Sequence, residues 1–141
     1  MRSTSRDTEL ASHLRIAIAR SARRLRQEAG TDLSPSLSAA LATIDRYGPL
    51  TPSELATRER VQRPTITRVA VRLEEQGLVT RAADPADRRS ALITVTPAGR
   101  ALLAAARTRK DAFLSERLDA LAPEDRATLE RAAALLEGML E

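Results

Sequence analysis

The sequence predicts a mainly α-helical fold with one small β-hairpin, and three observations support this prediction. Aromatic residues make up only 1% of the 141 residues, so aliphatic side chains must supply the core, as in closely packed helices. Apolar residues recur at helical spacing over most of the chain. One stretch instead shows two short β-prone runs on either side of a charged turn. The length fits a single domain over residues 1–141.

The first expected element is a long helix near the start of the chain. The apolar residues that recur there at helical spacing are Leu10, Leu14, Ala17, Ile18 and Leu25. Gly30 is typical of a helix end, which bounds this terminal helix at residues 9–30. We expect the polar residues 1–8 to form a disordered tail.

Two capping patterns predict the next two helices. Ser34-Pro35 offers an N-cap followed by proline in the first turn, and Gly48-Pro49 ends the pattern, which predicts a helix over residues 35–47. Thr51 and Glu54 have the spacing of a capping box and begin a short third helix that ends near Arg60.

A fourth helix begins at Gln62-Arg63-Pro64 and ends at Gly77. Its apolar residues, at i, i+3, i+4 and i+7, are Ile66, Val69, Ala70 and Leu73. Two short helices joined tightly predict a helix-turn-helix. Residues 78–82 and 91–96 then predict a hairpin with a charged tip, and helices are expected over residues 98–121 and 124–140. The prediction is therefore a winged helix-turn-helix over residues 34–97, flanked by long helices at 9–30 and 98–141.

This order of elements resembles the MarR (multiple-antibiotic-resistance regulator) family of winged helix-turn-helix transcriptional regulators. The matching motifs, in order, are Leu50 to Ala56, Arg63 to Arg68, Leu73 to Val79, Arg81, Asp84 to Arg89 and Thr94 to Gly99. Two residues depart from the family pattern: Gln62 stands where a Ser or Thr cap is frequent, and Val71 where an Asp is common. We expect the missing cap to lower the stability of the helix start by about 1 kcal/mol.

The fourth helix is expected to enter the major groove of double-stranded DNA. Opposite its apolar stripe, or on the flank, lie Arg63, Pro64, Thr65, Thr67, Arg68 and Arg72. Arg68 is our first candidate for sequence recognition, because a guanidinium can donate two hydrogen bonds to guanine O6 and N7. The alternative is that Arg68 and Arg72 are solvated charges paired with Glu74 or Glu75.

The hairpin tip and the third helix supply further candidate contacts. We expect Asp87 to hold a neighbouring arginine while Arg88 or Arg89 reaches the minor groove, where the family usually places its wing arginine. The alternative is a merely soluble turn. Expected phosphate contacts, besides the start of the third helix, are Thr51, Ser53, Arg58, Arg60 and Arg81.

The net charge is compatible with DNA binding but does not by itself establish it. The chain carries +4, and 22 of its 23 basic residues are arginines, although coding bias is an alternative cause of that excess. Residues 51–96 hold eight arginines and six acids, whereas residues 97–141 are net −1. Residues 1–29 carry the largest excess, +4, and the sequence leaves open whether they face DNA or solvent.

The resemblance implies a homodimer and a small ligand. In the family the terminal helices form the dimer, and the apolar stripes of residues 10–25 and 129–140 agree with this, the alternative being that they close on their own chain. Family members often bind a small aromatic or phenolic anion between the dimer and the DNA-binding region. With one Tyr and one Phe, we expect an aliphatic pocket with His13, Arg15 and Tyr47 as weak candidates, His13 alone being more often a surface residue.

Enzymatic activity, metals and cofactors are not expected. The chain has no Cys, a single His and five scattered glycines, which excludes a disulfide, a zinc site and a phosphate-binding loop. No signal peptide or membrane-spanning run is evident, so we expect a cytoplasmic protein. The predicted function is a DNA-binding regulator, most simply a repressor relieved by a ligand. The alternative is a helical protein-interaction module, an adaptor or antagonist with a degenerate winged helix.

Overall fold

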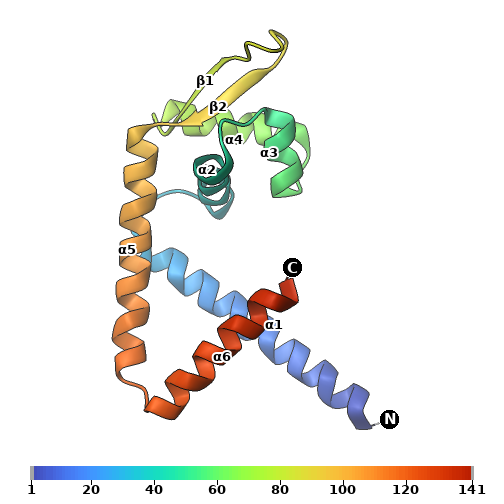
Figure 1. The fold of residues 1–141 in the computed structure, drawn as a ribbon, viewed down its shortest axis with the longest axis vertical. Coiled ribbons are helices and arrows are strands. Elements are labelled where there is room, and N and C mark those ends of the chain that lie inside the picture. Colours follow the sequence, from blue (N-terminus) through green and yellow to red (C-terminus); the bar gives the residue numbers. More distant parts are fainter. Residues whose placement is uncertain (1, 141) are drawn as a thin grey trace.

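The computed structural model describes residues 2–140 and confirms the predicted order of elements (Figure 1). In this part of the chain the elements are α1 (Arg2–Glu28), α2 (Pro35–Tyr47), α3 (Pro52–Glu59), α4 (Arg63–Glu75), β1 (Val79–Ala83), β2 (Ala91–Val95), α5 (Pro97–Asp119) and α6 (Pro123–Leu140). Each bound lies within about two residues of the prediction, except the start of α1. None of the described helices combines the length and apolar character needed to cross a membrane.

The first helix starts earlier than expected. Residues 2–8 continue α1, whereas the sequence predicted a disordered tail; residue 1 lies outside the described residues. The segment contains neither Pro nor Gly, and the Thr8 hydroxyl donates to the Thr4 carbonyl at 2.7 Å. Extending an existing helix adds one backbone hydrogen bond for each residue ordered, so polar residues prolong it at little cost.

The predicted caps form at α2 and α3, and a further cap, which was not predicted, forms at α5. Ser34 Oγ accepts from the Leu37 amide at 3.3 Å, and Thr51 Oγ1 accepts from the Glu54 amide at 3.2 Å. Thr96 Oγ1 accepts from the Gly99 amide at 3.1 Å and donates to the Gly77 carbonyl at 2.7 Å, which joins the ends of α4 and β2 to the start of α5. At α4, Gln62 makes no side-chain capping bond, as its departure from the family pattern predicted.

The hairpin is antiparallel, with Val79 opposite Val95 and Ala83 opposite Ala91. Leu50, just before α3, exchanges two backbone hydrogen bonds with Ile93, at 3.0 and 2.8 Å. No pattern in the sequence predicts this pairing, because a single bridging residue leaves no alternation of apolar and polar residues. It attaches the hairpin to the helix-turn-helix.

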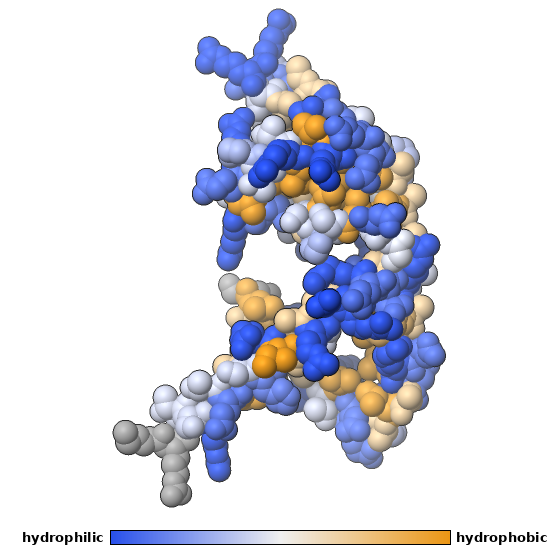
Figure 2. Space-filling model, turned by 180° about the vertical axis from the view of Figure 1, so that it is seen from behind, coloured by the Kyte–Doolittle hydropathy of each residue, from blue (hydrophilic) through white to orange (hydrophobic). Residues whose placement is uncertain are grey.

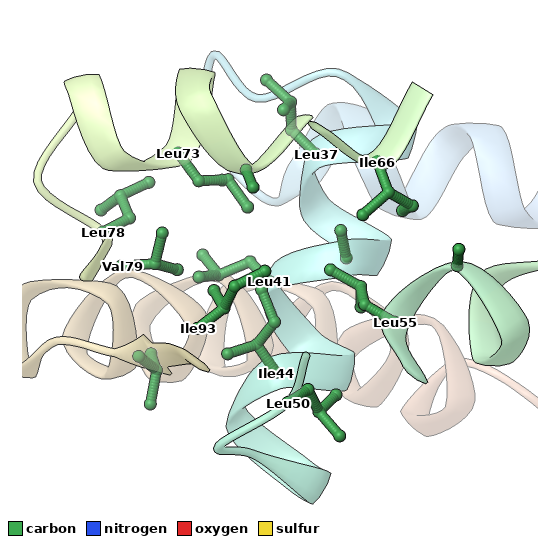
Figure 3. Close-up of a cluster of buried hydrophobic side chains, with 14 residues drawn as sticks. Leu37, Leu41, Ile44, Leu50, Leu55, Ile66, Leu73, Leu78, Val79 and Ile93 are labelled. Carbon is green, nitrogen blue, oxygen red and sulfur yellow. The ribbon is translucent and has the colours of Figure 1, made fainter. Parts of the chain in front are cut away.

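The core lies within residues 37–95, between α2, α3, α4 and the hairpin (Figure 3). Its largest fully buried side chains come from each of these elements: Leu41, Ile44, Leu55, Ile66, Leu73, Val79 and Ile93. Burying side chains of this size stabilises the fold by about 1.5–3 kcal/mol each. The core therefore fixes how α4 is rotated about its axis, and hence which residues α4 exposes.

The terminal helices lie outside this core. The long helix α5 leaves the hairpin and runs down one side of the molecule, α1 packs against it, and α6 turns back at its far end (Figure 1). No residue of α6 is buried by the described chain. Most of the apolar surface of α6 therefore remains available.

Candidate nucleic-acid interface

The fourth helix presents one polar face to solvent. Ile66, Ala70 and Leu73 are fully buried, so the opposite side of α4 faces outward. On that side Pro64, Arg68 and Arg72 are exposed and Thr65 is half-buried, and on its flank Arg63 and Thr67 are exposed. The structure thus gathers all six predicted residues on the accessible surface of one helix.

The guanidinium groups of Arg68 and Arg72 are unpaired. Within residues 2–140 neither makes a hydrogen bond or an ion pair, so the expected alternative, pairing with Glu74 or Glu75, is not formed. Both residues, with Thr65, line a groove of about 430 Å³ beside the start of α2, together with Asp32 and Ser36. Two cations are therefore available to an incoming anion.

The hydroxyl hydrogen of Thr67 is already engaged in a hydrogen bond within α4. Its hydroxyl donates to the Arg63 carbonyl at 3.2 Å, one helical turn earlier. The oxygen lone pairs remain able to accept a hydrogen bond from a base or a bridging water.

The candidate phosphate contacts of the third helix differ in position and in the contacts they make. Thr51 and Ser53 lie in the first turn, whereas Arg60, at the other end, has a positive φ of 55°. The Arg58 guanidinium stacks on the Tyr47 ring, with its Cζ 3.8 Å from the ring centroid. Tyr47 therefore contacts an arginine side chain rather than a ligand cavity.

Arg81 on the first wing strand is already engaged. Its Nε and Nη2 atoms donate to the two carboxylate oxygens of Glu74 at 3.1 and 3.0 Å. This hydrogen bonding holds the pKa of the Glu74 carboxyl below its ordinary value and raises the pKa of Arg81. The pair attaches the wing to the end of α4, and any phosphate bound by Arg81 would compete with this carboxylate.

The wing tip is ordered through its backbone. The Asp84 carboxylate accepts from the Ala86 amide at 2.9 Å, and the Asp87 carboxylate accepts from the Arg89 amide at 3.0 Å. The sequence predicted that Asp87 would pair with an arginine side chain; it instead closes an Asx-type turn, because a short side chain reaches the amide two residues on most easily. Arg88 and Arg89 are exposed, and no ion pair within the described residues involves them.

The predicted ligand residues do not come together. His13 and Arg15 are exposed on α1, and Tyr47 lies at the far end of α2. A cavity of about 660 Å³ lies between α1, α2 and α5, and none of these three residues lines it. The three candidates therefore do not share a cavity within residues 2–140, and their role in ligand binding stays a prediction.

Four other cationic residues line that cavity, and they were not among the residues predicted from the sequence. They are Arg23 and Arg26 of α1 and Arg107 and Lys110 of α5. Each pair is spaced i, i+3, so each pair shares one helix face, which was the available signal. That the two faces meet is a property of the tertiary structure.

The outer apolar faces belong to the terminal helices. Exposed side chains on α1 and α6 include Leu10 (57%), Leu129 (49%), Leu135 (56%) and Met139 (72%). Figure 2 shows apolar side chains at the surface of the half of the molecule that these helices form. The described chain therefore leaves these apolar side chains uncovered.

Comparison with known proteins gives one consistent result. The model of the MarR family matches residues 33–91. An uncharacterized HTH-type transcriptional regulator of Mycobacterium bovis is 39% identical over 136 residues, which are 96% of this chain and 95% of that protein. The crystal structure of a transcriptional regulator protein of Pseudomonas aeruginosa is similar with a TM-score of 0.87 and 35% identity, covering 96% of each chain.

Two further solved structures carry information on binding. A mutant of MepR of S. aureus, bound to an oligodeoxyribonucleotide, has a TM-score of 0.71 at 18% identity, over 94% of this chain and 98% of that one. BpsR of Bordetella bronchiseptica, whose DNA binding is regulated by 6-hydroxynicotinic acid, has a TM-score of 0.68 at 25% identity, over 93% and 92% of the two chains. The first of these shows a shared fold alone.

Proposed function

The chain belongs to the MarR family of transcriptional regulators, and from this premise we propose that it is a dimeric repressor relieved by a small molecule. Its proposed partner is a pseudo-palindromic operator in double-stranded DNA, because a two-fold dimer presents two identical helices to half-sites about one helical turn apart. A dimer that covers a promoter blocks polymerase sterically. The proposed location is the cytoplasm.

The unpaired arginines of α4 and the wing tip carry this proposal. Arg68 donates to guanine O6 and N7, Thr65 and Thr67 contact bases or phosphates, and the Pro64 ring contacts a thymine methyl. Arg63 and Arg72 flank this group. Arg88 or Arg89 enters the adjacent minor groove. MepR, which shares the fold, is bound to an oligodeoxyribonucleotide.

Contacts with the DNA phosphates set the register of the protein on the duplex. Thr51 and Ser53 lie at the start of α3, where Thr51 already caps the Glu54 amide and the Ser53 amide has no helical partner and favours a phosphate. Arg58, Arg60 and Arg81 remain proposed phosphate contacts, with the stacking of Arg58 and the pairing of Arg81 as competing interactions.

The exposed apolar faces of α1 and α6 support the homodimer. Leu10, Leu129, Leu135 and Met139 are each about half exposed or more, and large apolar side chains exposed together on the terminal helices are typical of an association surface. The proposed occupant is a second copy of the same chain.

The cavity between α1, α2 and α5 supports relief by a ligand. It is bounded by helices of the terminal region and by α2 of the winged helix, so an occupant touches both parts. A ligand that binds this cavity more tightly in one arrangement of the two parts shifts the population toward it. The regulation of BpsR by 6-hydroxynicotinic acid supports this mode of action.

The test is binding of the purified protein to duplex DNA from the flanks of its own coding region, measured by fluorescence anisotropy at two salt concentrations. Arg68→Ala and the Arg88→Ala/Arg89→Ala double variant are compared with Arg20→Ala, which removes one charge from an exposed position on α1. Loss of the contact made by Arg68 is expected to cost about 1–3 kcal/mol and to relax base preference at one position.

Each outcome separates the two candidate functions. Saturable, sequence-preferring binding that falls steeply with salt and is weakened by both wing and α4 variants supports the repressor. If the protein prefers no flanking sequence, selection from random duplexes follows. Failure of that selection would refute the DNA-binding proposal and favour the protein-interaction module.

A further inference from the structure

The cavity between α1, α2 and α5 has an unusual distribution of charge. Arg23 and Arg26 line it from α1, and Arg107 and Lys110 line it from α5. No Asp or Glu is among its lining residues, and in the described part of the chain none of the four cations makes an ion pair. Four like charges around one cavity favour an occupant with more than one negative charge.

The remaining wall is aliphatic. Leu102 and Leu103 of α5 are half-buried against the core, Ala106 is buried, and Leu33 faces them from the α1–α2 connection. No aromatic side chain lines the cavity, so an aromatic ring could stack there only on a guanidinium group. An alkyl chain, by contrast, gains from burial against this wall.

Neutral donors lie beside the cations. The hydroxyls of Thr31 and Ser38 and the amide of Gln27 also line the cavity. A phosphate offers three oxygens to such donors, and the guanidinium fork matches phosphate geometry with two parallel hydrogen bonds. A carboxylate would satisfy only one of the four charges.

We propose that this cavity binds a small soluble aliphatic compound that carries a phosphate group, the phosphate lying among Arg23, Arg26, Arg107 and Lys110 and the alkyl part against Leu102 and Leu103. The proposal rests on the proposed ligand-relieved regulation and replaces the aromatic anion expected from the family resemblance. The cavity volume of about 660 Å³ lies in the range usual for pockets that hold a small molecule.

The test is isothermal titration calorimetry on the full-length protein. The probes are n-hexyl phosphate, hexanoate, salicylate and inorganic phosphate, which separate the contributions of the phosphate, the alkyl chain and an aromatic ring. Hexyl phosphate is expected to bind at least about tenfold more tightly than each of the others. Hexanoate and salicylate lose charge-assisted hydrogen bonds of the phosphate, and inorganic phosphate loses the burial of the alkyl chain.

Variants locate the site. Arg107→Ala/Lys110→Ala and Arg23→Ala/Arg26→Ala are each expected to weaken binding of hexyl phosphate by about tenfold or more, whereas Arg6→Ala, at an exposed position near the start of α1, retains it. Circular dichroism and thermal melting establish that each variant is folded. Equal loss in Arg6→Ala, or unchanged binding in both double variants of the cavity, would overturn the assignment.

Other outcomes also decide the ligand class. Tighter binding of salicylate than of hexyl phosphate would overturn the proposal in favour of an aromatic anion. Retention on vesicles that contain phosphatidic acid, without binding of soluble hexyl phosphate, would overturn it in favour of a lipid surface. Because calorimetry needs no DNA, this test is independent of whether the protein binds an operator, which the anisotropy experiment decides separately.

Discussion

At the scale of single residues, the wing depends on a few polar contacts whose partners are far apart in sequence. Glu74 and Arg81 join the end of α4 to β1, and Thr96 joins the end of α4 to the start of α5. These contacts set the angle between the wing and the fourth helix. They are therefore the contacts at which small substitutions should alter the DNA-binding surface.

The Glu74–Arg81 pair predicts a dependence of stability on pH. The pKa of Glu74 is lowered in the folded protein, so the pair stabilises the fold above the ordinary glutamate pKa, about 4.3, and this contribution is lost as the pH falls below it. Urea denaturation at neutral and acid pH should show that Glu74→Gln removes part of this dependence. Glu75→Gln, at the exposed neighbouring position, serves as the control, and an equal effect of both would contradict the role of Arg81.

Thr96 provides a second prediction at this scale. Thr96→Val keeps the shape but removes the cap of α5 and the hydrogen bond to the Gly77 carbonyl, and should lower the free energy of unfolding by about 1–2 kcal/mol. Thr96→Ser keeps the hydroxyl and should recover most of that loss. Chemical denaturation measures both, and a serine variant as unstable as the valine variant would disprove the capping role.

At the scale of elements, local signals in the sequence were sufficient for most of the fold. Proline after Ser34 and Thr51, glycine at 30 and 77, and the stripe of Ile66, Ala70 and Leu73 act within one or two helical turns, so they could be recognised in the sequence. The same signals predicted which face of α4 is exposed.

What the sequence could not supply depends on contacts between elements. The Leu50–Ile93 bridge, the partner of Arg81 and the cavity of α1 and α5 each join segments that are distant in the chain. The helical start at Arg2 was missed for another reason, because polarity was interpreted as disorder although no helix-breaking residue is present.

The junction of wing and α5 gives a prediction for a single element boundary. A Cβ atom on Gly99 would lie 2.3 Å from the Leu78 carbonyl oxygen and 2.8 Å from Val95 Cγ2. Gly99→Ala should therefore force the hairpin and α5 apart, at a cost of about 1–3 kcal/mol in unfolding free energy. At Gly138 of α6 nothing lies within 4 Å of the same atom, so Gly138→Ala is the matched control. Equal stability of the two variants in thermal unfolding would contradict the close packing at Gly99.

At the scale of the whole molecule, two parts with different kinds of surface are joined by α5. The winged helix has a closed core of its own, whereas α1 and α6 expose large apolar side chains. The proposed dimer covers these side chains and sets the separation of the two α4 helices. DNA binding should therefore fail when the dimer fails, even if each winged helix stays folded.

Leu135→Asp tests this dependence. A carboxylate on the apolar face of α6 should convert a dimer to a chain of 15.3 kDa in sedimentation experiments and lower operator affinity by more than about tenfold. Glu137→Lys changes the charge at a position of α6 that is already polar and should leave both properties unchanged. A wild-type protein that sediments as a monomer at micromolar concentration would refute the proposed dimer.

The short connection over residues 29–34 has a consequence for how this protein can change. Arg109 donates to the Ala29 carbonyl at 3.1 Å and packs against Gly30, whose φ is +68°, so α5 holds the connection in place. One side of the connection, at Thr31 and Leu33, lines the cavity, and Asp32 lines the groove that holds Arg68 and Arg72. Because both the proposed ligand site and the proposed DNA-binding groove border this segment, a substitution in it is expected to alter both of them. Engineering of a biosensor from this chain should therefore vary Arg23, Arg107 and their neighbours on α1 and α5, and leave the connection unchanged.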